Sequence, residues 1–545
     1  MKNIVYIVLL CVFITACDEE KWLEEEVFSA YTSDNSYSTP QLIDIAVVQL
    51  YRNISDIRYG DINTGSTFAF QYTTDCGYNS LNLNSNLNGW GDSIVPENGQ
   101  VEHFWEKYFK IIYNANVILN RIDAVEYTSE AERNIKIGEA KFFRAYAYRS
   151  LVILYGGVPL VLEEITSPKR DFVRASAEAV WEQIIDDLTD ATQLLPEADD
   201  VEQDGRIAKG VAYHALSEAY IVVEDYPKAI AAASEVIDNL GYELMKVRFG
   251  TRSTEPGDVY WDLFRRGNQN RGSGNTEAIY VSQYEFLTPG GEINDLLPRF
   301  SLAQYWRLTG NDGVNLFTGP TKRNGGRGIA WWSPSNYVID QIWENSPGDI
   351  RNSEYNVIRD LVVDNPASSY FGQNMVESGA LDGVNIPFGR RWPGAIFAKC
   401  TPIDNFPEEV VDNQANNSHR DRYVMRLAET YLLRAEAYLL NGNPDAAAND
   451  INELRARSSA PLITGGDVTM EFILDERARE LFVEEERLLT LMRTGTIVER
   501  VRQFNPVHNG TYGSLQIFDH QNVWPIPNRD IIVNSDAVLE QNPDY

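Results

Sequence analysis

Cys17 is the residue whose type and setting most clearly indicate covalent chemistry. It follows the small residues Thr15 and Ala16 at the end of a short apolar run, and Lys2 stands before that run. A charged head, an apolar core and a small-residue cleavage site are typical of a secretory signal peptide. The run is shorter than the ~20 residues that a membrane-spanning helix needs, and a plain buried helix rarely lies at the extreme N-terminus. We therefore expect residues 1–16 to be a lipoprotein signal peptide and Cys17 to be acylated.

No other group of residues has the spacing of a catalytic or metal site. None of the five histidines lies in a His-Glu-x-x-His motif or a nucleophile–base pattern. The Gly-rich stretch NGGRGIAWW lacks the strand–turn–helix setting of a phosphate-binding loop. Cys76 and Cys400 either pair in an oxidising compartment or stay as buried free thiols, and the sequence leaves both alternatives open.

The charge of the chain argues against nucleic acid as a partner. The formal net charge is −32, so a polyanion would be repelled. We interpret the acidic residues as a solvated, mutually repelling surface. Residues 241–420 differ from the rest: they hold 17 Lys+Arg and 21 Asp+Glu, a net charge of −4, which leaves −28 for the remaining residues.

Two stretches predict the same helix–turn–helix unit, KGVAYHALSEAYIVVEDYPKAIAAASEVIDN and RLAETYLLRAEAYLLNGNPDAAANDINEL. In both, small or branched residues lie nine and thirteen positions after a tyrosine (Tyr220, Ala229 and Ala233; Tyr438, Ala447 and Ile451). Small residues at such positions permit two helices to approach closely, as in tetratricopeptide hairpins. Two chance helical pairs are the alternative.

Three further stretches have helical spacing of apolar residues: FWEKYFKIIYNANVILNRI, EAKFFRAYAYRSLVILYGG and DERARELFVEEERLLTLMRTG. The third is expected to be one helix with a single apolar face (Ala478, Leu481, Phe482, Leu488 and Met492). In contrast, helical periodicity fades in residues 60–100 and 241–420, and the second of these ranges holds six of the eleven tryptophans. Long irregular segments in an ordered protein are often functional.

The chain resembles the SusD/RagB family of lipoproteins from the signal peptide to the last residue. The stretches that carry the resemblance, in this order, are YFKIIYNANVIL, EAKFFRAYAYRSLVILYGGVPLV, RLAETYLLRAEAYLLNG, ERARELFVEEERLLTLMRTG and VWPIPNRDIIVNSDAVLEQNPDY. Three positions depart from the family pattern. Glu485 and Asp544 stand where the family usually has Gly, and Thr490 stands where Asp is common. We expect these changes to affect only local packing and capping.

The resemblance implies one mainly all-α domain over residues 17–545. Tetratricopeptide-like helical hairpins are expected to form one side, roughly residues 38–240 and 421–500. A large irregular insertion lobe, roughly 60–100 and 241–420, is expected to carry the ligand surface.

The resemblance also implies a location and a function. Members are lipid-anchored in the outer membrane, here through Cys17, face the cell exterior, and lie as a lid on a SusC-like TonB-dependent transporter. They capture oligosaccharides, or peptides in the RagB branch, without chemistry on the ligand, so we expect no enzyme activity and no cofactor. Whether a calcium ion orders a loop stays open. A protein-only tetratricopeptide scaffold is a third alternative.

The ligand residues that we expect rest on composition and setting. Sugar recognition needs flat aromatic faces together with polar groups for the hydroxyls. The glycan-binding candidates are Trp90, Trp331, Trp332, Tyr78, Tyr305 and Trp306, with core packing as the alternative for each. The Asn-rich setting of Trp90 predicts exposure, and in an extended backbone only one of Trp331 and Trp332 can face outward. Six arginines could meet an acidic sugar or a peptide carboxylate, unless they pair with the protein's own acids (Arg265, Arg266, Arg323, Arg327, Arg390 and Arg391).

Overall fold

The computed structural model describes residues 36–60, 70–71, 73–80, 82–83, 88–291, 295–386 and 394–545. Residues 1–16, Cys17, Arg390 and Arg391 lie outside the described residues. Within those ranges, no helix has both the length and the hydropathy that crossing a bilayer requires.

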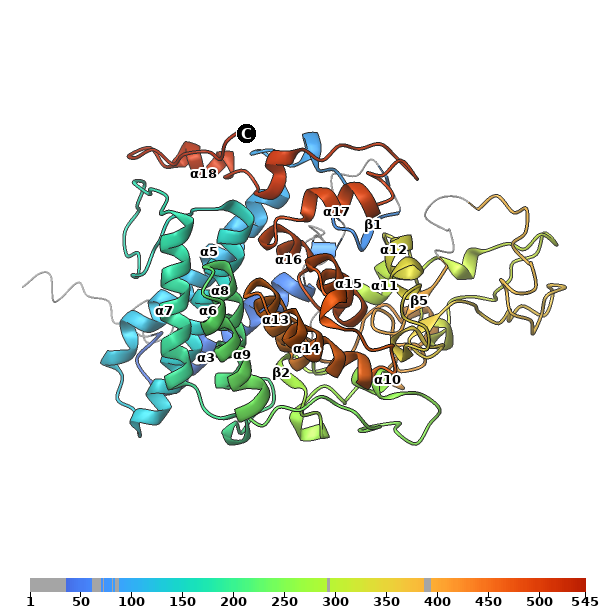
Figure 1. Cartoon of the computed structure of the whole chain (residues 1–545), viewed down its shortest axis with the longest axis horizontal. Coiled ribbons are helices and arrows are strands. Elements are labelled where there is room, and N and C mark those ends of the chain that lie inside the picture. The colour runs from blue at the N-terminus through green and yellow to red at the C-terminus, as the bar shows by residue number, and fades with distance from the viewer. Residues whose placement is uncertain are drawn as a thin grey trace, which may run out of the picture.

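The fold is mainly helical, as the sequence predicts. The helices are α3 (Pro40–Ser55), α5 (Gly99–Arg121), α6 (Glu130–Tyr155), α7 (Ala177–Leu194), α8 (Lys209–Val222), α9 (Tyr226–Ser234), α10 (Val259–Leu263), α11 (Leu297–Ser301), α12 (Asn336–Ile339), α13 (Leu427–Leu440), α14 (Pro444–Arg457), α15 (Met470–Leu481), α16 (Arg487–Arg493), α17 (Ile497–Phe504) and α18 (Asn528–Val533). The long helices α3 and α5–α9 gather at one end of the molecule, α13–α17 lie in the middle, and the irregular chain forms the other end (Figure 1).

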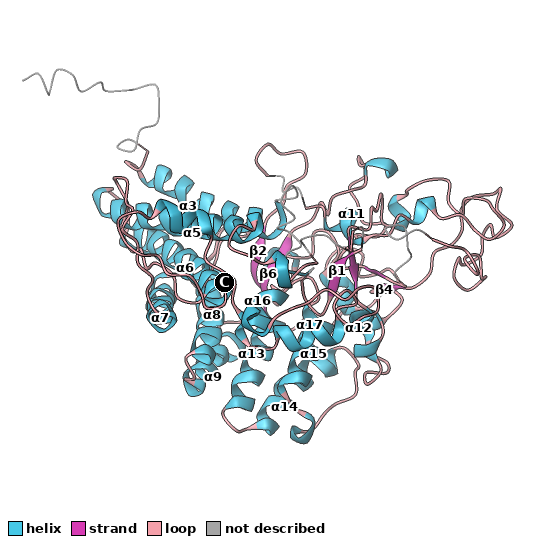
Figure 2. Ribbon diagram, turned by 90° about the horizontal axis from the view of Figure 1, so that it is seen from above, coloured by secondary structure: helices cyan, strands magenta, loops and turns pink. Residues whose placement is uncertain are grey.

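The strands are short and form three separate antiparallel pairs. They are β1 (Gly77–Asn79) with β3 (Trp332–Pro334), β2 (Ala278–Ser282) with β6 (Arg422–Arg426), and β4 (Val357–Ile358) with β5 (Ile396–Phe397). Figure 2 shows β1 and β4 within the irregular end, and β2 and β6 in the middle of the molecule beside the helical end. Each pair joins segments that are distant in the sequence, so the strands fasten the loops of the lobe.

Both predicted helix–turn–helix units are confirmed, as α8–α9 and α13–α14. The turns correspond position by position, because Glu224 and Gly442 both adopt a positive φ, 60° and 78°, and each is followed by an N-cap, Asp225 or Asn443. The predicted contact residues are buried between the helices (Ala229, Ala233, Ala447 and Ile451). Ile221, Ala229, Leu433 and Ala437 form one cluster, so the two units also pack against each other.

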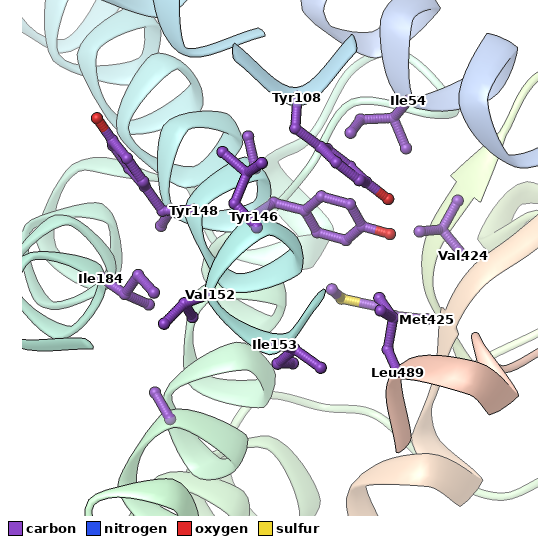
Figure 3. Packing of buried hydrophobic residues seen from close by; sticks show 14 of the residues in the cluster. Ile54, Tyr108, Tyr146, Tyr148, Val152, Ile153, Ile184, Val424, Met425 and Leu489 are labelled. Atoms are coloured by element: carbon purple, nitrogen blue, oxygen red, sulfur yellow. The ribbon is translucent and has the colours of Figure 1, made fainter. Parts of the chain in front are cut away.

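Helix α6 is the centre of the helical end and is buried on opposite faces (Figure 3). Its Tyr146 and Tyr148 point to opposite sides: the Tyr146 hydroxyl donates to Glu486 Oε2 at 3.0 Å, and the Tyr148 hydroxyl donates to the Val161 carbonyl at 2.8 Å. Ser129 caps the start of this helix, and Gly156, at φ 71°, ends it where the GG pair predicts.

The expected single helix over DERARELFVEEERLLTLMRTG is wrong, because the structure breaks it after Leu481. The backbone leaves the helical region at Phe482, and Val483 adopts φ 57°. This break separates the expected apolar face, since Ala478 and Phe482 pack in the lobe while Leu488 and Met492 pack in the main core.

The turn after Leu481 also directs three consecutive carboxylates toward different basic side chains. Glu484 pairs with Arg426 and Lys399, Glu485 with Arg477 and Arg487, and Glu486 with Arg149 and Arg58.

Buried ion pairs fasten the irregular lobe to α15–α17. Arg351 of the lobe lies 2.8 Å from Glu476 Oε1 and 3.0 Å from Glu480 Oε2, and all three side chains are inaccessible to solvent. Asp75 accepts from Arg487 Nη2 at 2.6 Å and from Arg500 Nε at 2.7 Å, also in the interior. The interpretation of the acidic residues as a solvated surface is therefore wrong for Asp75, Glu476 and Glu480. Their buried carboxylates hold distant segments in place.

Candidate ligand-binding surface

Strands β1 and β3 position the tryptophan pair. Asn79 lies opposite Trp332, and the Ser80 amide donates to the Trp331 carbonyl at 3.1 Å. Side chains alternate along an extended chain, so Trp332 is fully buried while Trp331 is 36% exposed. The expected division of the pair into one inward and one outward ring is confirmed. Gly77 makes room for the inward ring, because a Cβ there would lie 2.2 Å from Trp332 Nε1.

The Trp331 ring is held flat against a second aromatic ring. Its centroid lies 4.6 Å from that of Phe300, with 24° between the ring planes. Phe300 belongs to α11, and the Ile329 amide donates to the carbonyl of the preceding residue, Arg299, at 2.8 Å. Ala330 adopts φ 54°, a conformation that is costly for a residue with a Cβ, and it turns the chain immediately before Trp331. The result is a partly exposed, preoriented aromatic platform.

Trp306 lies on the segment next to this platform. Its ring is half-buried, and its Nε1 donates to the Gly328 carbonyl at 3.3 Å. The neighbouring Tyr305 is fully buried, and its hydroxyl donates to Gly326 O at 3.1 Å and accepts from the Thr321 amide at 2.8 Å. Tyr305 therefore fixes the loop, whereas part of the Trp306 side chain stays accessible.

The expected exposure of Trp90 is wrong. Its ring is 1% exposed, and its Nε1 donates to the Thr73 carbonyl at 2.8 Å. The neighbouring Asn88 forms a hydrogen bond within the loop and does not face solvent: its side-chain amide donates to the Asn79 carbonyl at 2.8 Å. Local side-chain bonds of this kind are a common use of Asn. The C-terminal segment covers the loop as well, through Gln521, whose amide donates to Gly91 O at 2.9 Å.

Tyr78 is also buried, at 5% exposure, and its ring centroid lies 5.7 Å from that of Tyr512. The buried rings of Tyr78, Trp90, Tyr305 and Trp332 therefore present no open face in this conformation, and core packing accounts for them. The structure places Trp331 and Trp306 on segments of the lobe that contact each other, since the Trp306 Nε1 donates to the carbonyl of Gly328, three residues before Trp331. Sequence reasoning did not identify Phe300, which carries no sequence signal beyond its aromatic type.

A more voluminous hollow lies elsewhere, on the helical end. This pocket, about 460 Å³, is formed by α5, the loop 159–172 and α18. Its lining includes Trp105, which is 5% exposed, and Tyr113, which is 45% exposed. Large pockets with aromatic linings are frequent ligand sites, so this pocket is a rival location for a ligand.

No described group of three or more His, Cys, Asp or Glu side chains is placed to hold a metal ion. Cys76 and Cys400 are both buried and free. Burial raises the pKa of the Cys400 thiol to about 12 and also raises that of Cys76, so neither thiol is reactive at neutral pH.

Two family descriptions match the chain. "SusD family" matches residues 327–545, and "Starch-binding associating with outer membrane" matches residues 21–221. SusD-like protein P25 of Formosa agariphila is 24% identical over 98% of this chain and 97% of its own length.

Solved structures share the fold. A laminarin-binding SusD-like protein superposes with a TM-score of 0.65 at 22% identity, over 93% of this chain and all of its own. Surface glycan-binding protein A from Bacteroides thetaiotaomicron, solved with laminarihexaose, gives a TM-score of 0.68 at 19% identity, again over 93% of this chain and all of its own. The two family descriptions, the full-length relative and the shared fold agree with the motifs in the sequence: the chain belongs to the SusD-like family.

Proposed function

We propose that this protein is a cell-surface lipoprotein that captures oligosaccharides and delivers them to a SusC-like TonB-dependent transporter in the outer membrane. The observation that carries the proposal is the Trp331 ring, partly exposed and stacked on Phe300 at 4.6 Å. The lipid anchor at Cys17, the outward orientation and the absence of catalysis belong to the same proposal. Support comes from a family description that names starch binding and outer-membrane association, and from relatives named for laminarin and laminarihexaose.

A preoriented ring suits sugar binding for a physical reason. The C–H face of a pyranose packs on an aromatic plane, and a ring that is already fixed loses little entropy when it binds. One stacked ring with a few hydrogen bonds gives micromolar to millimolar affinity, roughly −8 to −4 kcal/mol. Such affinity permits release of the ligand to a transporter. An open platform can also bind a sugar unit in the middle of a long polysaccharide.

Capture of peptides is the second candidate function, and the pocket beside Tyr113 is the observation that favours it. A pocket of about 460 Å³ would enclose a few side chains of a short peptide, whereas the Trp331 platform offers a flat face. The two candidates therefore predict different ligands and different sites.

The test is calorimetric titration of residues 18–545 with paired panels of oligosaccharides and short peptides. The described contacts all lie within residues 36–545, so removal of the first 17 residues disturbs none of them. We expect at least one oligosaccharide to bind in the micromolar to millimolar range and the peptides to give no heat of binding. Binding of peptides without binding of oligosaccharides would favour peptide capture as the function. If neither panel gave a heat of binding, that result would contradict capture of either ligand and favour a scaffold that binds only proteins.

A further inference from the structure

Two guanidinium groups lie at the Trp306 ring beside the Trp331 platform, and a third belongs to a neighbouring segment. The Arg307 Cζ lies 5.2 Å from the Trp306 ring centroid, and the Arg327 Cζ lies 5.9 Å from it. The third is Arg299, whose carbonyl accepts from the Ile329 amide, two residues after Arg327, at 2.8 Å. Burial, and after it the charge of Arg327, lowers the pKa of Arg299. Positive charges on neighbouring segments oppose one another, and a bound anion would relieve that repulsion.

Within the described residues, none of these three arginines forms an ion pair with a carboxylate. Elsewhere in the described chain most buried arginines pair with acids (Arg351, Arg426, Arg455, Arg457, Arg477, Arg487 and Arg500), and the buried Arg265 and Arg420 bind backbone carbonyls instead. In addition, Arg299 Nε is enclosed and has no hydrogen-bond partner among the described residues. In a chain with a net charge of −32, positive charges that gather on one surface, with no carboxylate partner among the described residues, offer a binding place for an external anion.

The cluster and the aromatic platform share the same two chain segments. Arg299 precedes Phe300, on which Trp331 stacks, and the Arg299 carbonyl accepts from the Ile329 amide at 2.8 Å. Arg327 is four residues before Trp331, which limits the distance between their Cα atoms to roughly 14 Å. That span is about the length of two or three sugar units. One oligosaccharide could therefore stack on Trp331 and present a charged group to the arginines.

We propose that the natural ligand of this surface is an anionic oligosaccharide, whose carboxylate or sulfate groups pair with Arg299, Arg307 and Arg327 while a sugar ring stacks on Trp331. This inference rests on the proposed glycan-binding function and narrows its substrate class. Guanidinium groups bind carboxylate and sulfate oxygens through two parallel hydrogen bonds. A neutral glycan would leave the three charges without partners. The many acids elsewhere would repel a polyanion from other surfaces and direct it to this one.

The test compares three probes by calorimetry at low salt: tetragalacturonate, which carries carboxylates, a sulfated carrageenan tetrasaccharide, and neutral laminarihexaose. We expect one of the anionic probes to bind at least tenfold more tightly than laminarihexaose, and its affinity to fall as salt is added. The preferred probe distinguishes carboxylate from sulfate recognition. Equal or tighter binding of the neutral probe would overturn the inference while leaving glycan capture intact. No binding of any of the three would overturn the anionic inference, and the broader glycan panel would then decide glycan capture.

The variant that tests the site is Arg307→Gln with Arg327→Gln, because both side chains are exposed and their loss should not affect folding. We expect it to weaken binding of the anionic probe at least tenfold and to leave neutral-glycan binding within twofold. The matched control, Lys228→Gln with Lys246→Gln, removes two exposed positive charges at other surfaces and should stay within twofold for both. Equal losses in the two double variants would mean that net charge alone acts, and would also overturn the inference.

Discussion

Asp75→Ala is expected to destabilise the protein by about 3–5 kcal/mol, the cost of breaking a buried ion pair on one side. The Asp75 carboxylate accepts from Arg487 and Arg500 in the interior, and their charges overcome the effect of burial and hold its pKa well below the ordinary value. Without Asp75, two buried guanidinium groups lose this partner. The loss should appear as a lower urea midpoint of unfolding, with the slope unchanged.

The matched control for this prediction is Asp123→Ala, which removes an exposed partner of Arg133. Exposed pairs contribute ~0–1 kcal/mol, so the control should unfold at almost the wild-type midpoint. The comparison bears on the site as well, because Asp75 lies two residues before β1 (Gly77–Asn79), the strand that pairs with the Trp332 strand. Equal effects of the two substitutions would show that the buried pairs do not fasten the lobe.

Acid is expected to weaken the protein steeply between about pH 4.5 and pH 2. Burial alone would raise the pKa of Glu476, but the charges of Arg351, Arg479 and Arg455 outweigh it and lower that pKa to about 2. The pKa of Glu218 is likewise about 2, because Arg149 and Arg493 outweigh its burial. Both folded-state values lie below the ordinary glutamate value of ~4.3. The stabilisation is therefore present above that value and is lost as the pH falls toward 2.

Each of these glutamates contributes about 3 kcal/mol by linkage, since one pKa unit corresponds to ~1.4 kcal/mol. Urea midpoints measured from pH 7 to pH 3 should be flat down to about pH 5 and then fall. Glu476→Gln provides the control: it should be less stable than the wild type at pH 7 and lose less stability on acidification. A midpoint that stays constant down to pH 3 would contradict the prediction.

The helical end could be predicted from the sequence because its signals are local. Apolar spacing, the small residues at the helix contacts and the caps at Asp225 and Asn443 all act within one hairpin. The break at Phe482 could not be predicted in this way. The helix ends there because distant groups, such as Lys399 and Arg426, bind Glu484 once the turn is made, and no short stretch contains both partners.

The positions that depart from the family pattern also divide into those with a local role and those with a role in contacts between distant segments. Asp544 adopts φ 68°, a conformation that glycine enters without strain, so the family preference at this position is local. Glu485 has a tertiary role, since its carboxylate binds Arg477 and accepts from the Thr490 hydroxyl at 3.0 Å. Two positions that depart from the pattern thus form one buried contact, which the sequence alone does not pair.

The candidate site could be predicted only in part for a related reason. Alternation along a strand correctly predicted that one of Trp331 and Trp332 would be exposed, because that rule depends on backbone geometry. The exposure of Trp90 was inferred from neighbouring asparagines, and the tertiary cover through Gln521 reversed it. Arg299, Arg307 and Arg327 come from separate positions in the sequence, so only folding reveals that none of them has a carboxylate partner among the described residues.

The measurement that tests the central claim most directly is calorimetric titration of the best-bound oligosaccharide into the wild type, Trp331→Ala and Tyr113→Ala. Both rings are partly exposed, at 36% and 45%, so neither truncation should unfold the protein. If the Trp331 platform is the glycan site, Trp331→Ala weakens binding at least tenfold, about 1.4 kcal/mol, and Tyr113→Ala binds like the wild type. Unchanged binding in Trp331→Ala, with loss in Tyr113→Ala, would contradict the account and place the ligand in the pocket between α5 and α18.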